Sequence, residues 1–277
     1  MTKIKLITDS TSDLRKSEIE KYDIEVLPVK VTIDGQEFDS IDNEEYIYKM
    51  RDAKQFFTSQ PSVGLFLEAY KKWTNLGYSV ISIHISSAVS GTYSTAASVA
   101  KEFNNVFVID SMTASRGMHY YIEDAYKYIK EGKDAEEIYK LLIEKQNKII
   151  TYVTIDRLDN LVKGGRLKKS AGLIGGLLNL KILTKLYPEE LAPVDKVRGK
   201  KRLIQSLIEN LKNDVAGKEI KKISLVNVLA YEYIDSIKEE IAKEFNYKIS
   251  DEDIFITTPA ISTHTGEGAV GIIVEIK

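Results

Sequence analysis

The run SVISIHI at residues 79–85 decides the fold class, because it is a nearly continuous, β-branched apolar segment followed by a polar turn. A helical pattern covers residues 90–103, and a second short apolar run, VFVI, follows at 106–109. Buried strands that alternate with helices in this way are typical of a parallel sheet with both faces covered. The sequence therefore predicts an α/β fold.

The alternation continues on both sides of this run and changes character near residue 150. Before that point we expect a Rossmann-like parallel-sheet domain (residues 1–150), and after it a mixed α/β domain (151–277), because helix-rich connections give way to a more mixed order. The expected strands are 3–8, 24–33, 79–85, 106–109, 149–155, 181–187, 223–229, 254–257 and 269–276. The expected helices are 12–21, 43–54, 62–75, 90–103, 114–131, 134–147, 200–212 and 231–245.

Composition excludes several classes of protein. The chain has 277 residues, 43% hydrophobic and 29% charged, with a net charge of −2 and no cysteine. Disulfide scaffolds, thiol catalysis and cysteine metal sites are therefore excluded, and three widely separated histidines argue against a zinc enzyme. The N-terminus enters a strand without the apolar segment of a signal peptide, and no apolar run approaches the length of a membrane span. We expect a cytoplasmic protein with no metal and no other cofactor.

One motif matches a nucleotide-binding fingerprint but lacks the strand-to-helix context that the fingerprint requires. The run GEGAVG at 266–271 matches the G-x-G-x-x-G fingerprint, but it leads into a strand at 272–276. That fingerprint works only where it opens a helix whose N-terminus faces a pyrophosphate. No P-loop and no G-x-S-x-G elbow is found either, so the sequence shows no motif for ATP binding or for hydrolysis.

Hydroxyl side chains gather instead where expected strands and helices meet. Such loops collect at the carboxyl edge of a parallel sheet, where hydroxyls and helix N-terminal amides suit a carboxylate or a phosphate. Any one Ser or Thr is explained by helix capping alone, but four such loops together indicate a ligand site. The runs are DSTSD at 9–13, TSQPS at 58–62, SSAVSGT at 86–92 and DSMT at 110–113.

A glycine-rich apolar segment lies within a basic stretch. KGGRLK at 163–168 precedes AGLIGGLLN at 171–179, which either packs in the core or lets backbone approach an elongated apolar ligand. Residues 163–202 hold eleven basic and three acidic side chains, although the protein as a whole is slightly acidic. This local excess suits an acidic partner surface or a phosphorylated ligand.

Several of these runs together resemble the DegV family of fatty-acid-binding (FakB-like) proteins, in order and along nearly the whole chain. The resemblance implies a two-domain α/β protein that holds one long-chain fatty acid between its domains. It also implies a carrier role, in which a separate ATP-binding subunit of fatty acid kinase phosphorylates the bound carboxylate. The matching runs are ITDSTSDL at 7–14, TSQPS at 58–62, SAVSGTY at 87–93, the segment 156–166, VRGK at 197–200, and HTG at 264–266 with Gly268 and Gly271.

The resemblance also implies the roles of particular residues. The carboxylate site is implied at Thr58, Ser90, the Gly91 amide and His264. Arg166 is implied at the head-group entrance and Arg198 on the surface that meets the kinase, and no catalytic residue is expected in this chain. Glu267 departs from the family, which often has proline there. An acid beside the head-group loop must point away or be paired.

Elementary energetics agree with lipid binding. Burying about sixteen carbons at about 0.8 kcal/mol each contributes on the order of 12 kcal/mol to binding. The entropic costs of association and of ordering the chain remove several kcal/mol of this. A buried carboxylate then requires hydrogen-bond donors, and it would favour the protonated form of His264.

Two other functions remain open at this point. One is an acyl or phosphoryl hydrolase that uses Asp9, Asp110 and His264, and the other is a nucleic-acid-binding regulator that uses residues 163–202. Aromatic residues do not interleave with the basic ones in that stretch, so we expect no nucleic acid.

Overall fold

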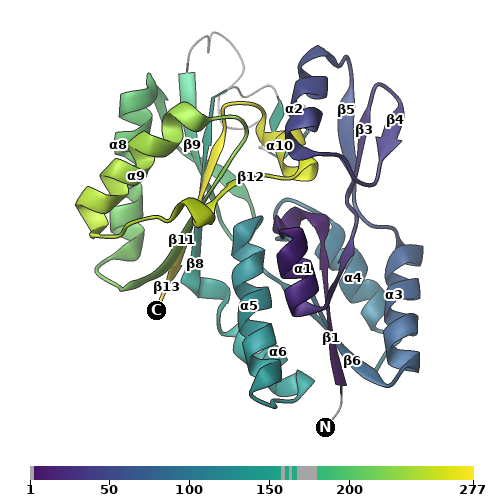
Figure 1. The fold of residues 1–277 in the computed structure, drawn as a ribbon. Coiled ribbons are helices and arrows are strands. Elements are labelled where there is room, and N and C mark those ends of the chain that lie inside the picture. The colour runs from purple at the N-terminus through teal and green to yellow at the C-terminus, as the bar shows by residue number, and fades with distance from the viewer. Residues whose placement is uncertain (1–2, 157–159, 162–163, 167–179) are drawn as a thin grey trace.

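The computed structural model describes residues 3–156, 160–161, 164–166 and 180–277. The glycine-rich run at 171–179 and part of the 156–166 segment lie outside the described residues. The chain forms a parallel sheet, a mixed sheet and a small antiparallel sheet (Figure 1). The α/β prediction is confirmed.

The parallel sheet has the strand order β2-β1-β6-β7, and all of its strand pairs are parallel. Residues of β6 alternate between its faces: Ile81 and Ile83 pack with α5 and α6, whereas Val80 packs with α3 and α4. Both faces are covered, which explains the nearly continuous apolar pattern of β6. The strands are β1 (Lys3–Asp9), β2 (Ile24–Leu27), β6 (Tyr78–His84) and β7 (Val106–Asp110). The helices are α1 (Lys16–Tyr22), α5 (Arg116–Lys130) and α6 (Ala135–Ile143) on one face, and α3 (Val63–Asn75) and α4 (Thr92–Ala100) on the other.

The prediction of a single strand at 24–33 is wrong. Strand β2 ends at Leu27, before Pro28, and a new strand, β3 (Lys30–Ile33), begins in a different sheet. Proline has no N–H to donate to a strand partner, so it divides the run at this point. Strand β3 pairs antiparallel with β4 (Gln36–Phe38) and with β5 (Phe56–Ser59).

Two helices pack with this small sheet. Helix α2 (Asn43–Asp52) belongs to the same part of the chain, whereas α10 (Pro259–Thr265) comes from near the C-terminus (Figure 1). Strands β4 and β5 and helix α10 were not predicted. All three elements are short, and hydrophobic periodicity is weak over so few residues.

The mixed sheet has the order β10-β9-β8-β13-β11-β12, and only β11 and β12 pair in parallel. Helices α8 (Lys200–Val215) and α9 (Tyr231–Phe245) cover one face, and α5 reaches the other, where the Tyr120 hydroxyl donates to Ser224 Oγ at 2.8 Å. Strand β8 begins next to the predicted domain boundary at residue 150, which stays a prediction. The strands are β8 (Ile149–Ile155), β9 (Leu180–Leu186), β10 (Leu191–Arg198), β11 (Ile220–Asn227), β12 (Ile254–Ile256) and β13 (Val270–Ile276).

Strand β10 was also missed. It lies at the edge of the mixed sheet, and its register with β9 shifts between Pro193 and Asp195. A proline and a bulge are tolerated at an edge, and they hide the strand in the sequence. Three short 3₁₀ helices complete the described elements: η1 (Ser10–Ser12), η2 (Gln146–Lys148) and η4 (Asp251–Asp253). Among the residues described, none of the helices combines the length and the apolar character that crossing a membrane requires.

Candidate functional site

A pocket of about 680 Å³ of atom-free space, its mouth included, lies where the three sheets meet. Thr11 contributes from η1, which follows β1, Thr58 from β5, and Ser90 from the loop before α4. Most of its wall is apolar and comes from both halves of the chain. These apolar side chains are Val29, Ile85, Val89, Ala114, Val153, Leu161, Leu186, Leu191, Ala260 and Ile261.

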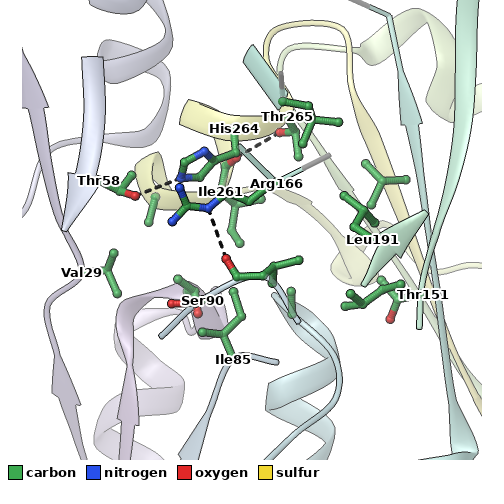
Figure 2. Close-up of a pocket in the computed structure, with 17 residues that line it drawn as sticks. Val29, Thr58, Ile85, Ser90, Thr151, Arg166, Leu191, Ile261, His264 and Thr265 are labelled. Carbon is green, nitrogen blue, oxygen red and sulfur yellow. Dashed lines mark hydrogen bonds between the residues drawn. The ribbon is translucent and has the colours of Figure 1, made fainter. Parts of the chain in front are cut away.

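Three polar side chains, Thr58, Arg166 and His264, gather at one end of the pocket. His264 Nε2 and Thr58 Oγ1 are 2.9 Å apart, and the Arg166 guanidinium lies beside the imidazole (Figure 2). Thr151 and Leu191 lie toward the other side in this view. The pocket therefore combines a donor cluster with an apolar interior, which is the chemistry that an amphiphile with an anionic head requires.

The pocket keeps His264 neutral at physiological pH. Burial, and secondarily the positive charge of Arg166, lower the pKa of His264 to about 4. Its Nδ1 atom is buried and has no hydrogen-bond partner in the part of the chain that the structure describes. A buried nitrogen without a hydrogen-bond partner costs free energy in the folded protein.

Arg166 is held against the pocket by backbone carbonyl groups. Its Nη1 donates to Gly164 O at 2.6 Å, and its Nε donates to Val89 O at 3.3 Å. Burial lowers the pKa of Arg166, but a guanidinium stays charged in proteins. These two bonds fix a positive charge at the polar end of the pocket.

Ser90 also lines the pocket, but Gly91 does not. The Ser90 hydroxyl lies 2.8 Å from Thr92 Oγ1 and accepts from the Thr92 amide. Gly91 lies behind it, where an added Cβ would be only 2.2 Å from Gln60 Oε1. The Gln60 side chain is exposed and can move away, so packing alone does not require the glycine, and the role of its amide stays a prediction.

The two remaining predicted positions lie outside the pocket. Arg198 ends the edge strand β10 and is exposed. Glu267 forms a two-pronged ion pair with Arg51, at 2.7 Å from Nε and 2.6 Å from Nη2. The expectation that this acid must be paired is confirmed.

The structure does not bring together the three residues of the hydrolase alternative. Asp9 is fully buried and bonds His84 Nδ1 at 2.9 Å, while His264 bonds Thr58. Asp110 accepts from the amides of its own loop and of the β6 loop. Neither carboxylate lines the pocket, so no acid–base pair faces it among the described residues.

Part of the described basic stretch is paired with acids from other segments. Lys181 pairs with Asp156, and Lys185 with Asp214 at 2.7 Å. Thr11 and Thr151 are lining residues that sequence reasoning did not assign, although Thr11 lies in a predicted hydroxyl loop.

Comparison with known proteins identifies the family of this chain. The model of the DegV family, described as uncharacterised proteins, matches residues 3–277. A DegV domain-containing protein of Staphylococcus aureus is 38% identical over 99% of both chains.

Solved structures of DegV proteins match this chain over nearly its full length. A protein of Thermotoga maritima, described as a DegV lipid-binding protein, is 31% identical, with a TM-score of 0.83 and coverage of 99% of this chain and 98% of its own. DegV of Bacillus subtilis, described as a fatty-acid-binding protein, is 29% identical, with a TM-score of 0.84 and full coverage of both chains. The match of the family model from the first strand to the last residue shows that this chain belongs to the DegV family.

Proposed function

We propose that this protein binds a long-chain fatty acid in the pocket between its two domains. The observation that carries the proposal is the pocket itself, whose Thr58, Arg166 and His264 cluster at one end of an apolar interior. Relatives from Thermotoga maritima and Bacillus subtilis, described as lipid-binding and fatty-acid-binding, support it.

The carboxylate would bind at the polar end. Arg166 supplies a fixed positive charge, Thr58 and Ser90 supply hydroxyl donors, and the Gly91 amide is close in sequence to Ser90. A carboxylate beside the imidazole favours its charged form, so ligand binding would raise the lowered pKa of His264. Donors of this kind offset the cost of removing a carboxylate from water.

The acyl chain would continue beyond the pocket into a second, smaller cavity of about 370 Å³. The two cavities share Ala114, Val153 and Ile261 in their walls, so a flexible chain can run from one to the other. The second wall is almost wholly apolar, with Val226, Val228, Ala269 and Ile273 among its members. Burial of methylene groups there supplies most of the affinity.

We further propose that the bound carboxylate is presented to a separate ATP-binding kinase subunit, which would place the protein in the cytoplasm. A carboxylate oxygen would attack the γ-phosphorus of ATP on that subunit, forming the acyl phosphate C–O–P linkage as the bond to ADP breaks. The chain has no P-loop, which is why the nucleotide is assigned to the partner. Exposed Arg198 is the residue we assign to the surface that meets it.

Two experiments separate these proposals. His264→Ala should weaken palmitate binding by lipid-free protein, and an unaltered affinity would contradict the head-group site. Arg198→Glu should impair acyl phosphate formation with the kinase subunit, whereas Lys101→Glu, an exposed control at the end of α4, should not. Equal rates for both variants would contradict the partner surface, and turnover of esters by this chain alone would support the hydrolase instead.

A further inference from the structure

We propose that a groove on the outer side of the Thr58–His264 pair is a subsite for a phosphoryl group, with Lys54 as its outer cation. The inference rests on the proposed fatty-acid binding and names the group that this site receives once the carboxylate has been phosphorylated. The ligand class is a long-chain phosphate ester or anhydride.

The groove shares a wall with the acyl pocket. It has about 890 Å³ of atom-free space, its open side included, and Thr58, Arg166 and His264 line both it and the inner pocket. These three side chains therefore form the partition between the inner pocket and the groove. A head group bound at the partition has direct access to the groove.

The groove is positively charged. Lys54 and Arg166 line it, and no Asp or Glu is among its described lining residues. Lys54 is exposed, and its ammonium makes no ion pair with any residue that the structure describes, although Asp34 accepts a bond from its backbone amide at 3.0 Å. Many lysines elsewhere are paired, such as Lys72 with Glu25 at 3.0 Å.

Arg166 and Gln55 supply the spare donors of this groove, because the Nε2 atom of His264 contacts Thr58 and its Nδ1 atom is buried against Gly164. Gly164 lines the groove but not the inner pocket. Two of the five N–H groups of Arg166 donate to backbone carbonyls of described residues, and Gln55 adds an exposed amide.

The chemistry of the product requires such a place. Phosphorylation adds three terminal oxygens and raises the head-group charge from the −1 of the carboxylate to about −1.5 to −2, on a ligand whose tail is buried. The apolar pocket cannot accept that charge without a large desolvation cost, so the phosphoryl group must lie on the outer side of the partition. A lysine and an arginine there would hold it while the tail stays bound.

The test compares hexadecyl phosphate with palmitate on lipid-free, full-length protein. Isothermal titration should show that Lys54→Gln loses about fivefold more affinity for hexadecyl phosphate than for palmitate, as expected for one partly exposed ion pair. Lys54→Glu should show a larger difference. Lys71→Gln, an exposed lysine on α3 outside the groove, is the matched control and should change neither affinity.

The outcomes are distinguishable. Equal losses for the two ligands in Lys54→Gln would overturn the subsite while leaving fatty-acid binding intact. Binding of neither ligand by the wild type would overturn the proposed function. Displacement of hexadecyl phosphate by an equal concentration of inorganic phosphate would also overturn the inference, since it would indicate a site for free anions rather than for a lipid head group.

Discussion

The Thr58 hydroxyl and His264 Nε2 are 2.9 Å apart, although 206 positions separate the two residues in the chain. Thr58 lies on the small sheet of the N-terminal half, and His264 lies on α10 near the C-terminus. Their contact therefore joins distant parts of the chain at the polar end of the pocket (Figure 2). In the proposed function, head-group binding and the packing of α10 on the small sheet would be linked through this pair.

Thr58→Val removes the hydroxyl and keeps the shape of the side chain. It should weaken palmitate binding by about two- to twelvefold, because one hydrogen bond contributes about 0.5–1.5 kcal/mol. Isothermal titration of lipid-free protein measures the effect. Thr74→Val, which removes a hydroxyl on α3 that bonds only backbone carbonyls, should bind palmitate like the wild type. Equal affinities for all three proteins would contradict the role of Thr58.

Gly164→Ala tests the position of the His264 ring. An added Cβ would lie 2.4 Å from Nδ1 and 3.0 Å from Asn160 O, so the imidazole must shift. Overpacking of this kind costs about 1–3 kcal/mol, and palmitate affinity should fall roughly tenfold. Gly64→Ala is the control, because its Cβ would meet only Ser62 Oγ at 3.8 Å. Undiminished binding by Gly164→Ala would show that the ring position does not matter.

Ala114→Leu should narrow the passage between the two cavities, since Ala114 lines both. We expect the variant to retain decanoate while palmitate affinity falls by roughly tenfold or more, because a longer tail loses buried methylene groups. Competition against a fluorescent fatty acid across a series of chain lengths measures this. Ala192→Leu on β10, which is outside both cavities, is the control. A uniform loss at all chain lengths would contradict the proposed path of the tail.

The free energy of unfolding of lipid-free protein should depend on the protonation of His264 below neutral pH. The pKa of His264 is about 4 in the folded protein and 6.5 ordinarily, so the unfolded chain binds more protons between these values. Stability due to neutral His264 is therefore present above pH 6.5 and is lost as the pH falls toward 4. Across this window the wild type should lose up to about 3 kcal/mol more than His264→Gln in urea unfolding. Parallel pH profiles for the two proteins would contradict the buried, neutral imidazole.

The parallel sheet was predictable because its signal is local. Strands such as β6, buried on both faces, are apolar over most of their length, and the helices that follow have a clear period. The small sheet was not predictable in the same way, since β4 and β5 are short and partly exposed. As a result Thr58 was expected in a loop, whereas it lies on a strand that faces α10.

The site was predictable only in part. The hydroxyl loops indicated an anion site, and the resemblance to the DegV family gave Thr58, Ser90, His264 and Arg166, all of which line the pocket. No sequence pattern reveals that Nδ1 of His264 is unpaired or that Arg51 neutralises Glu267, because both depend on contacts between distant segments. Burial and the charge of Arg166 set the pKa of His264, and these too exist only in the folded chain.

Native mass spectrometry of the purified protein, followed by denaturation and identification of the released lipid, tests the central claim most directly. The account predicts a mass excess of one ligand per chain, which is released as a long-chain fatty acid and is reduced in His264→Ala. A protein that carries no lipid and takes up no added fatty acid would contradict it.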